Sequence, residues 1–576
     1  MVAPLSTIST GYPMQIPTRR TAQAVALAIG ALALVVSRTA AAQSALQSTR
    51  SQLGAVASGH PLATEAGVRM LELGGNAADA AVATGFAIAV VEPTMNSIGG
   101  RNQILIRLPN GMVRGIDGTT QAPPNYNPET APQAAYGYNV IAVPGAVAGL
   151  LRLHREHGSL PLATVMAPAI DYAENGYRLL PGEAAREAGN ARQSAEFPAT
   201  AAIYLKPDGT PRRAGEMLVQ KDYANTLRAI AKGGADEFYR GSIARAMAAD
   251  LTAHRTSVDL AAIESYKAVD ARIVRSTYRG YEVIGMDVPT AGSVVLQALN
   301  VMERFDPKSM SAAQWAAVEG QALGIASREM RVLGTDTAAA RATSKQWAAQ
   351  IAPTIRTPTQ MPEGGATSLP ALDPVFDHEG HTTHLTAADT SGMFVALTQT
   401  LGPNMGSSVV TPGLGFLYAS TLGGYLGRME PGERARSFIS PMMVLKDGVP
   451  VLALGAAGGG RIVSGVLEVI SRMIDGGMSL SDALAAPRVH MNTNGTLDLE
   501  TTPGIGWTPA EVEQIKALGI QVTETPSVGA FSRVHAIQFD AATKTWIGGA
   551  DPDWEGSARS PAPPRRGRGG QPPPPR

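Results

Sequence analysis

The stretch Glu379-Gly380-His381-Thr382-Thr383-His384-Leu385-Thr386 determines how the rest of this chain is interpreted. Residues 334–380 before it have the composition of a loop, and after it the pattern changes to strands and tight glycine turns. Cleavage of the backbone before Thr382 would give that threonine a free α-amino group beside its hydroxyl. A free α-amine has a pKa of about 7.7–8.0, so near neutral pH it can accept the hydroxyl proton. The stretch therefore predicts cleavage between His381 and Thr382, with nucleophile and base both on Thr382.

The same stretch offers a second chemistry, because His378, His381 and His384 recur every three residues. Three histidines at this spacing share a face only on a helix, where they could bind a metal ion. Pro374, Gly380 and the adjacent β-branched threonines disfavour a helix here. In an extended chain the spacing alternates faces. Metal binding is therefore the weaker alternative, and the sequence implies no metal and no other cofactor.

Composition bounds the class of protein. The chain has 576 residues, 44% of them hydrophobic, and no cysteine, which excludes disulfides and thiolate chemistry. The formal net charge is zero, but residues 1–42 carry three arginines and residues 559–576 carry five, neither segment with an acid. The body, residues 43–558, is therefore left at −8. An acidic body gives no support for a nucleic-acid partner.

The N-terminus has the pattern of a signal peptide. Arg19-Arg20 precede an apolar run over residues 22–36, and Ala40-Ala41-Ala42 is a small-residue cleavage site. The apolar run is shorter than the ~20 residues that a membrane span needs. We therefore expect residues 1–42 to be a signal peptide and the product to be exported, periplasmic or secreted, without a stable membrane anchor. The twin arginine leaves the choice between the general and the twin-arginine export routes open.

The remainder of the chain divides into a helical block and a block of strands. Helical patterns dominate residues 144–333, residues 334–381 lose periodicity, and residues 559–576 are too rich in Pro and Arg to pack. We expect a mobile linker at 334–381, a disordered tail at 559–576, and helices covering a pair of stacked sheets. The elements expected with most detail are helices over 62–73, 77–91 and 462–473, and strands over 55–58, 103–108, 112–116, 272–288, 383–388, 393–400, 416–420, 440–445 and 450–454.

Two further features carry chemistry. Gly455-Ala-Ala-Gly-Gly-Gly-Arg461 lies between a strand and a helix, where backbone N–H groups can hold the oxygen of a phosphate or a tetrahedral intermediate. No Gly-Lys-Ser/Thr follows, so it is not a P-loop, and a turn without a ligand is the alternative. Thr398 and Thr400 share one face of a strand that we expect antiparallel to the strand carrying Thr382. A solvated face is the alternative for that pair.

The following segments are typical of one family: 58–67, 74–81, 91–93, 98–100, 143–145, 167–176, 382–384, 400–401, 406–407, 455–461 and 549–552. Through them the chain resembles the γ-glutamyltranspeptidase (glutathione hydrolase) family of N-terminal nucleophile hydrolases, over nearly all of the mature chain. The resemblance implies an α+β fold, the four-layer αββα sandwich. It also implies that a large chain, 43–381, and a small chain, 382–558, remain together after self-cleavage.

The resemblance also assigns roles to individual residues. Thr382 is implied to be the nucleophile, and Thr400 to orient its amine and assist the cleavage. Gly458 and Gly459 match the backbone donors of the oxyanion hole. Ser437 matches the first of two serines that contact the γ-glutamyl group.

The chain departs from the family pattern where the substrate would be held. Thr119 stands where an arginine grips the α-carboxylate, and no acid lies near Gly423 and Gly424, where an aspartate holds the α-amino group. Phe438 replaces the second serine, and Gly402 an asparagine. Losing both halves of this clamp removes the charged pairs that distinguish γ-glutamyl from other acyl groups.

Arg101 interrupts the glycine-rich loop after Gly99 and Gly100. We hypothesise that it supplies a cation to the altered pocket, with a surface arginine as the alternative.

The sequence thus predicts a self-processing γ-glutamyltransferase-family threonine hydrolase that cleaves an amide through an acyl-enzyme intermediate. Its partner would be a small-molecule amide or peptide, with γ-glutamyl compounds such as glutathione as the default. Two alternatives stay open. One is an amidase or acylase of the same family with a specificity other than γ-glutamyl, and the other is a catalytically silent scaffold that binds a ligand.

Overall fold

The computed structural model describes residues 47–131, 134–328, 343–358, 381–527 and 529–563. The predicted signal peptide lies outside these residues, as do most of the predicted linker and the tail beyond residue 563. Among the helices of the described part, none combines the length and the apolar character needed to cross a bilayer.

The centre of the fold consists of two seven-stranded antiparallel sheets. We name one the Thr382 sheet, after a residue that it carries, and the other the Gly458 sheet, after the residue that directly follows its strand Val449–Ala457. The Thr382 sheet runs in the order β19 (Ser557–Arg559), β2 (Ala55–Ser58), β10 (His381–Ala388), β11 (Phe394–Gly402), β3 (Arg101–Arg107), β4 (Val113–Gly118), β7 (Val269–Asp270). The Gly458 sheet runs in the order β1 (Ser48–Ser51), β18 (Thr545–Ala550), β17 (Arg533–Asp540), β13 (Val449–Ala457), β12 (Met442–Lys446), β9 (Tyr281–Met286), β8 (Ile273–Tyr278).

The two sheets pack face to face through alternate residues of their strands. Phe394 and Ala396 of β11 point into this layer, as do Met443 and Ala453 of β12 and β13, all fully buried. Phe394 meets Trp546 of β18 edge to face at 5.1 Å between ring centroids. The other residues of β10 and β11, such as Leu397, face the helices. This alternation fixes which side chains can reach the space between the sheets.

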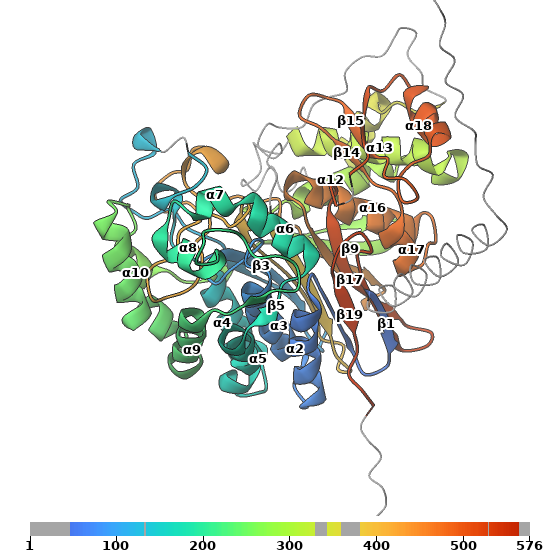
Figure 1. Ribbon diagram of the computed structural model, residues 1–576. Helices are drawn as coiled ribbons and strands as arrows, with labels where there is room; N and C mark the ends of the chain where they lie inside the picture. Colours follow the sequence, from blue (N-terminus) through green and yellow to red (C-terminus); the bar gives the residue numbers. More distant parts are fainter. Residues whose placement is uncertain (1–46, 132–133, 329–342, 359–380, 528, 564–576) are drawn as a thin grey trace, which may run out of the picture. The chain divides into compact units, whose positions relative to one another are not determined.

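Helices cover the outer face of each sheet, which completes four layers in the order αββα (Figure 1). On the Thr382 sheet lie α2 (Pro61–Glu72), α3 (Ala77–Val91) and α4 (Ala146–His157), with α5 (Leu162–Asn175) packed outside α3. The Gly458 sheet is covered by α12 (Gly292–Met302) and α16 (Ile462–Ile474), with α13 (Ala312–Arg328) and α18 (Pro509–Lys516) packed outside them.

Helix α3 shows why the sequence folds this way. Every one of its residues is buried, as expected of a helix that is apolar on all sides. Asn76 caps its N-terminus, and the carboxylate of Asp79 accepts a hydrogen bond from the Asn76 backbone N–H. The other α-helices and strands of the described residues are β5 (Tyr177–Arg178), α6 (Pro181–Gly189), α7 (Ala191–Ser194), α8 (Pro198–Tyr204), β6 (Met217–Leu218), α9 (Lys221–Tyr239), α10 (Ser242–Ala253), α11 (Leu260–Ser265), α15 (Lys345–Ile351), α17 (Leu480–Ala485), β14 (Val489–Met491), β15 (Leu497–Glu500) and β16 (Val522–Thr525).

The structure confirms most of the expected elements and corrects three. Residues 416–420 are not a strand, because they form only isolated bridges to Val410 and Gly99. Part of the expected linker is ordered, since α15 packs Trp347 into the core beside the Gly458 sheet. Arg559, assigned to the tail, belongs instead to β19, where it pairs with Val56.

Candidate active site

The residue pair around the predicted cleavage site lies at one end of the β10–β11 hairpin. Thr382 of β10 is paired with Thr400 of β11. The preceding residue of β10, His381, is paired with Gly402, which lies two residues further along β11, so the register shifts by one residue at the bond between His381 and Thr382. Gly402 has φ +92°, and a Cβ there would come within 2.8 Å of the Tyr425 ring. Glycine is therefore required at this bulge.

Thr400 joins the Thr382 hydroxyl to the bond that precedes it. Thr382 Oγ1 donates a hydrogen bond to Thr400 Oγ1 at 3.0 Å, and Thr400 Oγ1 donates to the carbonyl oxygen of His381 at 2.7 Å. The backbone N–H of Gly402 donates to Thr400 Oγ1 at 2.9 Å. The Thr400 hydroxyl thus accepts two hydrogen bonds and gives one, which uses its capacity fully. The prediction that Thr400 lies on a strand antiparallel to the one carrying Thr382 is confirmed.

Of the two described histidines of the stretch, His384 is buried and His381 is half-buried, and both are neutral. Burial, with the nearby cations Arg533 and Arg186, lowers the pKa of His381 to about 3. His384 lies between the sheets, where its Nδ1 contacts Thr398 Oγ1 at 2.7 Å and its Nε2 contacts Thr386 Oγ1 at 3.0 Å. Both ring nitrogens of His384 are therefore occupied, which leaves no lone pair for a metal ion.

The glycine turn faces this stretch from the other sheet. A Cβ on Gly455 would lie 2.4 Å from the His384 ring, so β13 crosses β10 in close contact. Two residues after Ala456 the chain reaches Gly458, with φ +131°, and then Gly459, with φ +58°. A Cβ on Gly458 would meet the Ser532 backbone at 2.9 Å. Both glycines therefore hold left-handed conformations at the start of α16, with their N–H groups in a turn.

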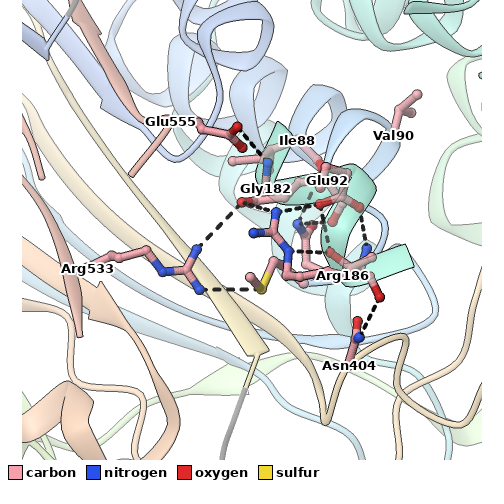
Figure 2. Close-up of polar contacts among 12 residues, drawn as sticks. Ile88, Val90, Glu92, Gly182, Arg186, Asn404, Arg533 and Glu555 are labelled. Carbon is pink, nitrogen blue, oxygen red and sulfur yellow. Dashed lines mark hydrogen bonds and ion pairs between the residues drawn. The ribbon is translucent and has the colours of Figure 1, made fainter. Parts of the chain in front are cut away.

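A cluster of buried charges lies beside His381, and sequence reasoning missed it. We define the charged cluster as Glu92, Glu183, Arg186 and Arg533 (Figure 2). Arg186 pairs with Glu183 at 2.6 Å, and both arginines lie 3.9 Å from Glu92. Burial raises the pKa of Glu92 to about 7 against the pull of the two arginines. Arg533 pairs with Ala457 in the β13–β17 register, so the cluster also adjoins the glycine turn.

The residues expected to hold the substrate are distributed differently. Ser437 lies ahead of β12, where its N–H donates to the Pro289 carbonyl at 2.7 Å and its Oγ accepts from the Ile439 N–H at 3.3 Å. Thr119 Oγ1 donates to the Ala435 carbonyl at 3.2 Å, so this position is occupied by a backbone contact. Residues 119 and 435 are therefore in contact, close to Ser437. Ser437 itself makes its hydrogen bonds with Pro289 and Ile439 and not with Thr382.

Arg101 is buried, with 2% of its surface exposed, so the surface alternative is wrong. It faces Thr400 across the β3–β11 pair. The phenol of Tyr425, which follows Gly423 and Gly424, is near enough that its ionisation would raise the pKa of Arg101.

The fold and the site together define a class. A threonine on an inner strand of an αββα sandwich, preceded by a polarised peptide bond and faced by a glycine turn, is the arrangement of N-terminal nucleophile hydrolases. The family model for gamma-glutamyltranspeptidase matches residues 63–560, and the chain belongs to that family as one of its enzymes.

Relatives of two kinds align with nearly the whole chain. The acylase ACY 1 proenzyme of Pseudomonas sp. (strain SE83) is 34% identical over 517 residues, 84% of this chain and 90% of that protein. The glutathione hydrolase proenzyme of Escherichia coli (strain K12) is 31% identical over 519 residues, 83% of this chain and 87% of that protein. The crystal structure of cephalosporin acylase from Bacillus halodurans has a TM-score of 0.80 at 27% identity, covering 89% of this chain and 96% of that one.

Proposed function

We propose that the chain is an exported proenzyme that cuts itself before Thr382 and then cleaves an amide through an ester on that threonine. The hydrogen-bond chain from Thr382 through Thr400 to the His381 carbonyl carries the proposal. In this chain Thr400 Oγ1 accepts a hydrogen bond from the attacking hydroxyl of Thr382 and donates one to the His381 carbonyl oxygen, which becomes negative during the attack. Residues 1–42 support the export, because they have the composition of a signal peptide.

This geometry supports self-cleavage. Thr382 Oγ1 attacks the carbonyl carbon of His381 as its proton passes toward Thr400, and the Thr400 hydroxyl stabilises the developing oxyanion. The C–N bond breaks as the Thr382 nitrogen takes up a proton in place of the one released from the hydroxyl, which leaves an ester on Thr382 and frees its α-amine. Water then hydrolyses the ester. The products are the carboxylate of His381 and an N-terminal Thr382 with a free hydroxyl.

The two chains would stay together because they share sheets. In the Thr382 sheet, β10 and β11 of the small chain lie between β2 and β3 of the large chain. In the Gly458 sheet, β12 pairs with β9 of the large chain. Separation would expose both strand edges and the apolar layer between the sheets, so we propose a stable two-chain enzyme.

Hydrolysis of the substrate then uses the freed amine. The α-amine of Thr382 takes the hydroxyl proton, the hydroxyl attacks the amide carbonyl, and the amine returns the proton to the leaving nitrogen. The turn at Gly458 and Gly459 supplies backbone N–H groups for the oxyanion. Water, or an acceptor amine, releases the acyl group.

The acyl group distinguishes two candidate activities. Glutathione and other γ-glutamyl compounds are one class, as the name of the Escherichia coli relative indicates. Thr119 and the acid-free segment 422–425 favour the second, an acylase activity, because they offer no charged clamp for a zwitterion. The Pseudomonas relative is named an acylase.

A panel of p-nitroanilides tests the proposal. The purified wild-type chain should release p-nitroaniline from at least one acyl group, and Thr382→Ala should be uncut and inactive. Thr383→Val is the matched control, because alternation places Thr383 on the opposite face of β10, and it should be cut and active. If the wild type were fully processed but hydrolysed no amide, the hydrolase proposal would fail and the ligand-binding scaffold would take its place.

A further inference from the structure

Arg101 begins β3 on the face of the Thr382 sheet that meets the Gly458 sheet. The register sets Arg101 against Thr400 on β11, and Thr400 against Thr382 on β10. Leu105 and Ala396, which share these faces, belong to the apolar layer between the sheets. Thr382, Thr400 and Arg101 therefore form one row across three neighbouring strands, with β3 about 10 Å from β10. Acyl groups attached to Thr382 have their far end within reach of this row.

Among the described residues, no carboxylate pairs with the buried guanidinium of Arg101. Its Nε and Nη1 atoms have no hydrogen-bond partner among the described residues, although the residue is 2% exposed. Burial lowers the pKa of Arg101, and the opposing influence comes from Tyr425, which is not a carboxylate. A buried cation is strongly unfavourable unless a ligand or a counter-charge pairs with it.

Comparison with two other buried arginines makes Arg101 informative. Arg107, at the far end of the same strand, donates to the carbonyl oxygens of Gly392 at 3.0 Å and Gly448 at 2.9 Å. Arg488 is paired with Asp551 at 2.7 Å. Each of these two arginines leaves only its Nε without a partner among the described residues, whereas Arg101 leaves both Nε and Nη1, and it does so in the row of the nucleophile.

We propose that Arg101 binds a carboxylate carried by the acyl group of the substrate. This inference rests on the proposed function, because it places the carboxylate relative to an acyl group bound at Thr382. A guanidinium matches a carboxylate in bidentate geometry, with two parallel charge-assisted hydrogen bonds.

The charges around Arg101 further narrow the substrate class. Residues 422–425, which end at Tyr425, contain no acid that could hold a substrate ammonium. An α-amino group near a buried guanidinium would also be repelled by it. The favoured substrates are therefore monoamides of dicarboxylic acids without an α-amino group, and γ-glutamyl amides are poorer substrates.

The test compares p-nitroanilides that differ only in the acyl group. Succinyl, glutaryl and adipyl anilides vary the position of the carboxylate, pentanoyl anilide removes it, and γ-glutamyl anilide adds the amine. In the wild type, the best dicarboxylic substrate should exceed the pentanoyl anilide about 100-fold in kcat/KM, which is the value of a charge-assisted hydrogen-bond pair. It should also exceed the γ-glutamyl anilide.

The variants assign this preference to one residue. Arg101→Met should bring the ratio of the two kcat/KM values to within a few-fold of one, and Arg101→Lys should leave an intermediate ratio because it keeps the charge without the fork. Arg107→Met is the matched control and should keep the wild-type ratio. If Arg101→Met is not processed, competitive inhibition of the wild type decides instead: glutarate should inhibit at least tenfold more strongly than its neutral diamide.

The outcomes separate this inference from the proposed function. No turnover of any anilide by processed enzyme would overturn both. Equal rates for the best dicarboxylic anilide and the pentanoyl anilide, or equal inhibition by glutarate and its diamide, would overturn the role of Arg101 alone. A preference for neutral acyl groups with a carboxylate on the leaving aniline would also overturn it, because the carboxylate would then lie on the other side of the scissile bond.

Discussion

Removal of one hydroxyl should nearly stop self-cleavage. In Thr400→Val the side chain keeps its shape, but the donor to the His381 carbonyl and the acceptor for Thr382 Oγ1 are lost together. Loss of one preorganised donor to a developing oxyanion costs about 10²–10³ in rate. The acceptor for the attacking hydroxyl is lost as well, so we expect slowing of at least 10²-fold.

The same change carries a smaller cost in stability. The Gly402 N–H, which donates to Thr400 Oγ1 at 2.9 Å, is left without its partner at a buried position. An unsatisfied buried donor costs about 1–3 kcal/mol, which is small beside the core of a two-sheet sandwich. The variant should therefore fold, and its thermal unfolding should be cooperative and shifted only slightly.

The assay is a time course of chain processing. Freshly purified chain is incubated, and the full-length species and the two fragments are quantified on a denaturing gel and by mass. Thr400→Ser is the matched control, because it keeps the hydroxyl and should process at a rate close to wild type. Processing of a folded Thr400→Val at the wild-type rate would refute the relay through Thr400.

Two other predictions concern the glycine turn and the charged cluster. Gly458→Ala should lower kcat of the processed enzyme by about 10²–10³. The reason is that φ +131° and the Ser532 backbone, 2.9 Å from a Cβ at this position, exclude a side chain, so that the oxyanion donors must move. Steady-state kinetics of wild type and variant check this prediction, and an unchanged kcat would contradict it. In the folded chain the pKa of Glu92 is raised to about 7, so folding favours its protonated form. The resulting contribution to the free energy of unfolding is present below pH 4.5 and is lost as the pH rises through 7. Denaturant titrations should show wild type losing roughly 3 kcal/mol more than Glu92→Gln between pH 4.5 and 8; parallel losses would contradict the assignment.

Local pattern in the sequence is enough to predict that Thr382 and Thr400 lie on antiparallel strands. Period-2 alternation places Thr398 and Thr400 on one face, and the turn at residues 389–392 makes their strand antiparallel to the one with Thr382. The glycine turn is equally local, because a strand, three glycines and a helix follow one another directly. Both features depend on residues that are close together in the chain, so they can be predicted from the sequence alone.

The rest of the site depends on pairings between distant segments. Arg101 joins the row of Thr382 only because β3 pairs with β11, some 300 residues later in the chain. The charged cluster gathers Glu92, Arg186 and Arg533 from three separate regions, and no periodicity of any one region indicates it. The helix α15 was missed because it is short and has only two large apolar residues, Trp347 and Ile351, which are too few for a helical period to show.

The central claim is that Thr382 becomes the N-terminus of a second chain by the protein's own action. Intact mass of the purified wild type, measured beside Thr382→Ala, tests it most directly. The account predicts two fragments from the wild type that meet between His381 and Thr382, and a single uncut chain from Thr382→Ala. A wild-type chain that stays whole after long incubation, or cleavage of Thr382→Ala at the same bond, would contradict it.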